Sequence, residues 1–251
     1  GGDGYSAAGA RGGDGGGAIW IEASGTVTIN GILSANGGNG VNNSTYWSGG
    51  GSGGSIYLNC HRFGGSTNGW IQANGGSNGT STVAGGGGGG RIAVHYGGLV
   101  GTPGVRFSAR NGASRYPVDI NAPMYSSAPQ PGSLCFTNPA LLDGLISAWS
   151  GAALNLNGYL FFESTNRWEP VGMTLLSNSI IGVWAGLSAR IPNDLTVSTG
   201  ALIVAPYGRW SCAGGLTLTN GAWLVVCGGE TNAAYTNGYG TRFEVSNRLT
   251  V

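Results

Sequence analysis

The sequence predicts an all-β fold, a right-handed parallel β-helix (β-solenoid) with long glycine-rich loops. A run of glycines gives way three times to the same alternating segment, at intervals of 37 and 36 residues between Ile19, Ile56 and Ile92. A second motif keeps step at intervals of 38 and 36 residues, beginning at Leu33, Ile71 and Phe107. No segment shows the pattern of an amphipathic helix of ordinary length.

The composition excludes several classes of protein. Glycine supplies 52 of 251 residues and charged residues only 8%, whereas about 7% and 25% are usual. Apolar residues make up 41% of the chain, which is too many for a disordered protein. All 11 basic residues are arginines, spread singly in a chain of net charge +1. We therefore expect no nucleic-acid partner. The apolar runs are too short for membrane insertion.

The first region, residues 1–113, contains the repeats of about 37 residues. Alternating apolar and polar residues predict short strands of three to five residues, with a turn at Ser24 and Gly25. Asparagine and glycine tolerate positive φ, so Asn36-Gly37-Gly38 and Asn74-Gly75-Gly76 are expected to form tight corners. Each repeat would then form one coil.

Equivalent residues of successive coils are expected to stack at about 4.8 Å. The inward ladders would be apolar and include Ile19/Ile56/Ile92, Ile21/Leu58/Val94 and Leu33/Ile71/Phe107. The outward ladders would be Trp20/Tyr57/Ala93, Glu22/Asn59/His95 and Ile32/Trp70/Arg106. Such a stack draws its stability from neighbouring coils rather than from any single one.

The rest of the chain divides into two regions. Residues 114–150 contain five prolines between Pro117 and Pro139 and are predicted to be a connector or an irregular insertion. Residues 151–251 repeat with a shorter period, because 195–204 aligns with 216–225 at an offset of 21 residues. This region is predicted to form a second set of coils, either continuous with the first or separate from it.

A family resemblance rests on the glycine run leading into Arg91-Ile92-Ala93-Val94-His95-Tyr96, on the Asn-Gly-Gly segments and on the 21-residue coils. Together they resemble the glycine-rich parallel β-helix arrays of large exported, adhesin-like bacterial proteins. The resemblance implies a secreted or cell-surface location and a structural or adhesive role. The start at Gly1, within a repeat, and the end at Val251 suggest a fragment whose neighbours are further coils of one longer chain.

No catalytic residue, cofactor or metal site is expected. Glu22 and His95 fall in one outward ladder but two coils apart, which is too far for a direct hydrogen bond. The main alternative is a non-catalytic part of a carbohydrate-active β-helix enzyme, a polysaccharide lyase or hydrolase. Cys212 and Cys227 lie on neighbouring predicted coils, and the sequence leaves open whether they form a disulfide.

Outward aromatic residues are the candidate binding residues. Aromatic rings bind the apolar faces of sugars and anchor protein interfaces. The candidates for contact with an extracellular glycan or protein are Trp20, Tyr57, Trp70, Tyr46 and Trp47. The alternative is that these rings only shield glycine backbone. A remote alternative is ice binding, suggested by hydroxyl pairs such as Thr26 and Thr28.

Overall fold

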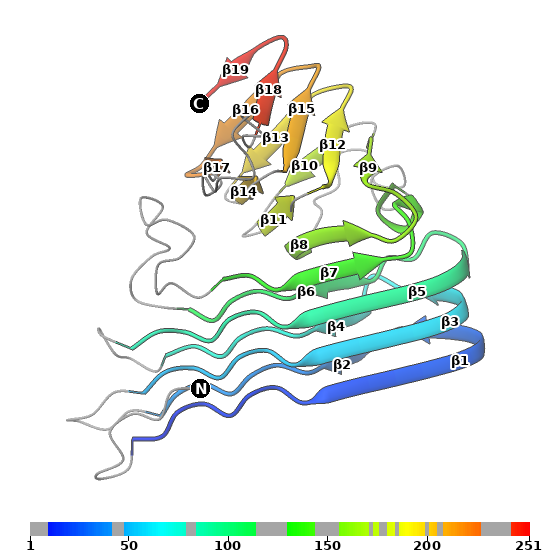
Figure 1. Ribbon diagram of the computed structural model, residues 1–251, viewed down its shortest axis with the longest axis vertical. Helices are drawn as coiled ribbons and strands as arrows, with labels where there is room; N and C mark the ends of the chain where they lie inside the picture. The colour runs from blue at the N-terminus through cyan, green and yellow to red at the C-terminus, as the bar shows by residue number, and fades with distance from the viewer. Residues whose placement is uncertain are drawn as a thin grey trace, which may run out of the picture. The chain divides into compact units, whose positions relative to one another are not determined.

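The computed structural model describes residues 10–41, 48–78, 84–113, 130–143, 156–170, 173–175, 180–183, 186–198, 201–204, 208–226 and 242–251. The chain divides into two compact units, Gly1–Cys135 and Phe136–Val251. The boundary falls inside the predicted connector, most of which lies outside the described residues. Apart from one helical turn at 140–143, the regular structure of the described residues consists of strands (Figure 1).

Each repeat of the first unit supplies one long strand and one short strand. The long strands are β1 (Ala18–Ile29), β3 (Ser55–Gly65) and β5 (Arg91–Leu99), and the short ones are β2 (Ile32–Ser34), β4 (Trp70–Gln72) and β6 (Arg106–Ser108). A further strand, β7 (Ser133–Phe136), lies at the boundary between the units. The pairs β1–β3, β3–β5, β2–β4 and β4–β6 are all parallel.

The predicted ladders of the first unit are confirmed in register. Ile19 pairs with Ile56 and Ile56 with Ile92, while Trp20 pairs with Tyr57. The second motif is aligned in the same way, with Leu33 opposite Ile71. Register is well specified because a slip of one residue would turn every buried side chain outward.

The long strands were predicted too short. β1, β3 and β5 have 12, 11 and 9 residues. The predicted turn at Ser24 and Gly25 is instead an irregularity within β1, where the register against β3 shifts between Ala23 and Thr26. A β-bulge of this kind changes the side-chain alternation without ending the strand, so the sequence pattern resembled a turn.

The core of the first unit lies along the inward side of these strands. Ile56, Leu58, Phe63, Val94 and Phe107 are at most 1% exposed. Phe63 stands at the centre of an aromatic group, with ring centroids 6.3 Å from Tyr96 and 6.4 Å from Phe107. The equivalent side chains of β1 are only half-buried, because β1 is an edge strand of the described sheet.

The glycine-rich runs are packed segments rather than tight corners. The prediction of tight corners is wrong, because no positive φ angle occurs at Gly37, Gly38, Gly75 or Gly76. These residues belong to what we call the glycine bundle. It consists of leading segments that run into the long strands (10–17, 48–54, 84–90 and 130–132) and returning segments that follow the short ones (35–41, 73–78 and 109–113). Figure 1 shows the segments side by side.

Backbone hydrogen bonds in the glycine bundle repeat every three residues. Gly13 and Gly16 donate to the carbonyls of Gly49 and Ser52 at 2.9 and 2.8 Å. Gly51 and Gly54 donate across the bundle, to Gly38 at 2.9 Å and to Ala35 at 2.8 Å. Three residues per turn is the repeat of the polyproline II helix, which makes no internal hydrogen bonds. Hydrogen bonds between neighbouring segments therefore satisfy the backbone N–H and C=O groups of the bundle.

Glycine is required in the bundle for close approach. A Cβ at Gly53 would overlap the carbonyl of Ala73 across the bundle, and one at Gly90 would overlap the carbonyl of Gly54 in the preceding repeat. The third position of each triplet in the leading segments points outward. There the nearest atom to a Cβ at Gly88 would be the carbonyl oxygen of Gln130, at 3.7 Å. In residues 50–54 and 86–90, only the third position of the triplet therefore has space for a side chain.

The second unit begins in β7, and its described residues contain twelve further strands. They are β8 (Leu156–Phe162), β9 (Arg167–Trp168), β10 (Met173–Leu175), β11 (Ile180–Val183), β12 (Ser188–Ile191), β13 (Leu195–Ser198), β14 (Ala201–Val204), β15 (Arg209–Cys212), β16 (Leu216–Thr219), β17 (Trp223–Val226), β18 (Arg242–Val245) and β19 (Leu249–Thr250). Two four-stranded sheets have the orders β10-β13-β16-β19 and β18-β15-β12-β9.

The 21-residue offset holds for only part of the second unit. Leu195 pairs with Leu216 at that offset, but Ala201 pairs with Trp223, one residue further than predicted. The extra residue lies in the turn at Asn220 and Gly221, whose φ angles are 54° and 73°. Asn-Gly is the preferred pair for two successive positive φ angles. The turn therefore accommodates the extra residue, and the strands that follow it pair at an offset one residue larger than the strands before it.

The prediction of a β-solenoid is wrong, whereas the all-β prediction is confirmed. One sheet contains eleven strands, and eight of them follow the order β1-β3-β5-β7-β8-β11-β14-β17. The short strands β2, β4 and β6 belong to the same sheet. This parallel strand order favours a barrel with a seam over a solenoid. In the first unit, the described glycine segments contribute no strand to any sheet.

A half-buried carboxyl group, that of Asp143, provides a test of packing in the second unit. The indole Nε1 of Trp168 donates a hydrogen bond of 2.9 Å to Asp143 Oδ1. Burial raises the pKa of Asp143, and this hydrogen bond opposes the rise only in part. A raised pKa means that folding favours the protonated acid. Its ionisation therefore lowers stability as pH rises from the ordinary carboxyl pKa through the folded-state value.

Asp143→Asn is therefore expected to raise the melting temperature at pH 7. The amide oxygen still accepts the Trp168 hydrogen bond, but no charge has to be buried. At about pH 3, below the ordinary aspartate pKa, the two proteins should melt together. Calorimetry of the full chain at both pH values measures this difference. Equal melting temperatures at pH 7 would contradict the prediction.

Candidate functional site

The outward face of β1, β3 and β5 carries the most exposed aromatic residue among the described residues. Trp20 is 68% exposed. It alternates with the inward Ile19 and Ile21, so strand geometry directs it to the opposite face. Tyr57 is its register partner on β3, and Ala93 is the partner of Tyr57 on β5.

The rings on this face form a stack. The Trp20 and Tyr57 centroids lie 4.1 Å apart, with an interplanar angle of 24°. Tyr57 also contacts the His95 ring, at 5.0 Å and 40°. His95 is diagonal to Tyr57, because its direct partner on β3 is Asn59. We call Trp20, Tyr57 and His95 the aromatic patch.

The contact with Tyr57 orients the Trp20 indole in the absence of a ligand. One side of the Trp20 ring packs on Tyr57, and the exposed fraction shows that much of the remaining surface reaches solvent. Holding an aromatic ring in its bound orientation lowers the entropy lost on binding. Polar side chains border the rings, with exposed Glu22 and Asn59 in one row and exposed Arg91 nearby. They can exchange hydrogen bonds with ligand hydroxyls.

Trp70 is on a different ladder from the aromatic patch. It pairs with Ile32 on β2 and Arg106 on β6. The Arg106 guanidinium carbon lies 4.0 Å from the centroid of the Trp70 ring, so a cation–π contact covers part of that ring. The structure thus brings Trp20 and Tyr57 together but does not add Trp70 to them. Tyr46 and Trp47 lie outside the described residues.

The geometry offers no direct acid–base pair at Glu22 and His95. Asn59 stands between them in the same row, paired with Glu22 on one side and His95 on the other. Two strand spacings separate their backbones by about 9.5 Å. Within the described residues, no group of three or more His, Cys, Asp or Glu side chains is placed to hold a metal ion.

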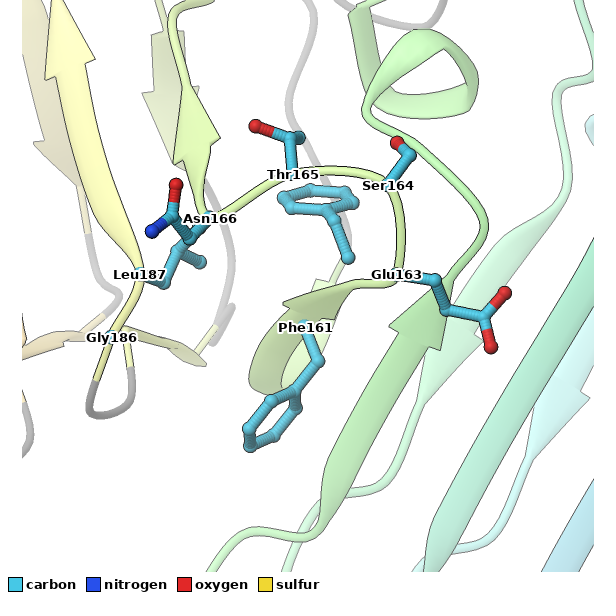
Figure 2. A pocket seen from close by; sticks show the side chains of 8 residues that line it. Phe161, Glu163, Ser164, Thr165, Asn166, Gly186 and Leu187 are labelled. Atoms are coloured by element: carbon cyan, nitrogen blue, oxygen red, sulfur yellow. The ribbon is translucent and has the colours of Figure 1, made fainter.

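A hollow of about 550 Å³ lies in the second unit (Figure 2). It is lined by Phe161, Phe162, Glu163, Ser164, Thr165, Asn166, Gly186 and Leu187. The Glu163 carboxylate points away from Asn166 and Leu187 in Figure 2. Glycoside hydrolysis generally uses two carboxyl groups, but this lining contains one. The hollow therefore adds no support for the hydrolase alternative.

Cys60 and Cys212 have the character of packing residues. Cys60 and Cys212 are buried, and burial raises the pKa of both thiols. A raised pKa leaves less of the reactive thiolate at neutral pH. The Cys212 Sγ lies 3.2 Å from the Asn193 carbonyl oxygen, as a donated S–H hydrogen bond requires. Cys227, its suggested disulfide partner, lies outside the described residues.

Sequence reasoning missed the outward side of the leading segments. The third positions of the triplets differ in the space around them: a Cβ at Gly85 would meet nothing within 4 Å, one at Gly49 would lie 3.2 Å from the Gly85 carbonyl oxygen, and Ser52 carries a side chain. The signal of the outward side in the sequence is the local three-residue spacing of glycines that must approach other backbone. Long glycine runs conceal that spacing, because every phase of the triplet contains glycine.

Comparison with known proteins identifies no relative. No family model, no curated protein and no solved structure matches the chain. No described helix has the length and apolar character needed to cross a membrane.

Proposed function

We propose that this chain is a non-catalytic structural and adhesion module of a secreted or cell-surface bacterial protein, and that it binds glycans through the aromatic patch. The parallel ladders and the glycine bundle serve as a stiff support for that patch. The bacterial and extracellular setting is supported by the family resemblance of the glycine-rich repeats.

The observation that carries this proposal is the ring of Trp20. It is held against Tyr57 at 4.1 Å between centroids and yet remains 68% exposed. Leaving a large aromatic surface in water forgoes the favourable free energy of burying it. A fixed, accessible indole is suited to the apolar C–H face of a pyranose ring, and the neighbouring polar side chains are suited to its hydroxyls.

Trp20→Ala is expected to weaken glycan binding by at least about tenfold, the loss typical of a central aromatic anchor. Tyr57→Ala should also weaken binding, because it removes the support of the indole. Binding of the full chain to a glycan array identifies the ligands, and titration calorimetry then measures their affinity. The matched control is Trp223→Ala, which removes a 44% exposed tryptophan from the second unit.

Three outcomes would count against the proposal. The first is an array with no glycan bound by the unmodified chain. The second is equal affinity in the Trp20 variant and the unmodified chain. The third is an equal loss in the Trp223 variant, which would indicate nonspecific adsorption to exposed indoles. Circular dichroism spectra that match that of the unmodified chain would show that each variant is folded.

A further inference from the structure

Asn-Gly dipeptides occur ten times in the chain, and in eight of them both residues are described. In such a pair the glycine backbone nitrogen, once it has lost its proton, attacks the carbonyl carbon of the asparagine side chain. The new N–C bond closes a succinimide ring, ammonia leaves, and water then opens the ring to aspartate or isoaspartate. Glycine favours this attack because it restricts the backbone least and has no side chain beside the nitrogen. The surroundings of each pair decide whether it reacts.

Most of the described pairs have the attacking nitrogen held in place. Five glycine N–H groups donate hydrogen bonds of 2.7 to 2.9 Å to backbone carbonyl oxygens, those of Gly37, Gly40, Gly69, Gly75 and Gly112. Four of these bonds, all except that of Gly69, link segments of the glycine bundle. In a sixth pair Asn157 is only 5% exposed, and Gly158 lies within β8, paired with Ile181. A nitrogen held in a hydrogen bond neither loses its proton to solvent nor turns toward the side chain until that bond opens.

The two remaining described pairs, Asn30-Gly31 and Asn220-Gly221, lack this protection. Among the described residues, these two glycine N–H groups donate no hydrogen bond. All four residues are exposed. They form short connections, one between β1 and β2 and the other between β16 and β17. A Cβ at either glycine would meet nothing within 4 Å, so the space beside each pair is open to a succinimide ring.

Each of these two asparagines makes one side-chain hydrogen bond, and both bonds are exposed. Asn30 Oδ1 accepts from the Ser66 N–H at 2.9 Å, and Asn220 Nδ2 donates to Ser198 Oγ at 2.9 Å. Water replaces an exposed hydrogen bond at little net cost. Neither bond therefore prevents the asparagine side chain from turning toward its glycine.

We propose that Asn30 and Asn220 are modification sites, which the folded chain converts to aspartate and isoaspartate without an enzyme, while the glycine bundle protects its own Asn-Gly pairs. Each conversion replaces a neutral carboxamide with a carboxylate, in a chain whose net charge is only +1. Isoaspartate also adds a carbon atom to the backbone. The turn at Asn220 and Gly221 depends on successive φ angles of 54° and 73°, so the longer backbone disturbs the connection between β16 and β17.

The test measures conversion at each described pair in one sample. The full chain is incubated in mildly alkaline buffer and then digested at acidic pH, which stops conversion during preparation, and mass spectrometry of the peptides distinguishes acid from amide. We expect Asn30 and Asn220 to convert at least about tenfold faster than Asn36 and Asn74, whose glycine N–H groups are released only when the bundle opens. Incubation in concentrated urea is the matched control. Unfolding releases every N–H, so the rates at the described pairs should then become similar.

Asn30→Gln and Asn220→Gln test the route of the reaction. The longer side chain would have to close a larger ring, so acid at the substituted position should form at least about tenfold more slowly. Equal conversion in a glutamine variant and the unmodified chain would refute the succinimide route at that position.

Two further results would overturn the proposal. Equal rates at Asn74 and Asn220 in the folded chain would show that the bundle gives no protection. A folded-state rate at Asn30 or Asn220 as far below its rate in urea as that of Asn74 would refute the assignment of that residue. None of these measurements depends on glycan binding, so the proposed function is tested separately.

Discussion

Gly87→Ala is expected to destabilise the first unit by about 3 kcal/mol or more, the upper range for inserting atoms into a packed interior. Gly87 lies in the middle of the glycine bundle, where its N–H donates to the Gly76 carbonyl at 2.8 Å. A Cβ there would overlap the backbone carbonyl of Gly51. Backbone cannot rotate aside as a flexible side chain can, so the repeats would have to separate and break bonds across the bundle.

Urea unfolding of the full chain measures this loss, and hydrogen exchange read by mass spectrometry locates it. The matched control is Gly88→Ala, one residue along, where a Cβ has ordinary clearance. That variant should retain the stability of the unmodified chain or gain a few tenths of a kcal/mol, because alanine restricts the unfolded chain more than glycine. Similar stabilities for the Gly87 and Gly88 variants would show that glycine is not required for close packing.

Phe63→Ala is expected to cost about 3 to 5 kcal/mol, the range for removing a fully buried phenylalanine ring. Phe63 is 0% exposed and contacts the rings of both Tyr96 and Phe107. Its loss leaves a cavity between β3 and its neighbours, and the ladder hydrogen bonds prevent the strands from closing it. Chemical denaturation of the first-unit transition gives the change in the free energy of unfolding.

Val27→Ala provides the comparison within the same row. Val27 is the register partner of Phe63 on β1 but is only half-buried. Its truncation should cost about 1 kcal/mol, since it removes fewer carbon atoms and they are less buried. A Phe63 variant no less stable than the Val27 variant would show that the buried aromatic group does not hold the unit together.

The ladders of the first unit could be predicted from the sequence because two constraints agree. The repeat period aligns Ile19 with Ile56, and the alternation of apolar and polar residues sets which side of the strand each occupies. Burial of the apolar side makes a one-residue slip costly, so a pattern within single strands predicted pairing between strands. The same logic placed Trp20 and Tyr57 together and Trp70 on another ladder.

The joining of long and short strands in one sheet and the conformation of the glycines could not be predicted from the sequence. Asn36-Gly37-Gly38 has the composition of a tight corner, and composition alone does not distinguish positive φ from close approach. The distinction depends on whether another backbone lies against the glycine, which is a property of the assembled bundle. In the second unit, the turn at Asn220 and Gly221 inserted a residue that a fixed 21-residue offset did not anticipate.

The sequence by itself determined the all-β character, the register of the first-unit ladders and the outward position of the aromatic patch. These follow from periodicity and from the burial of apolar side chains, which act locally and repeat with the chain. The tertiary structure alone decided that long and short strands join one parallel sheet and that glycine runs pack as a hydrogen-bonded bundle. Both depend on contacts between backbones far apart in sequence, which leave no side-chain pattern in a run of glycines.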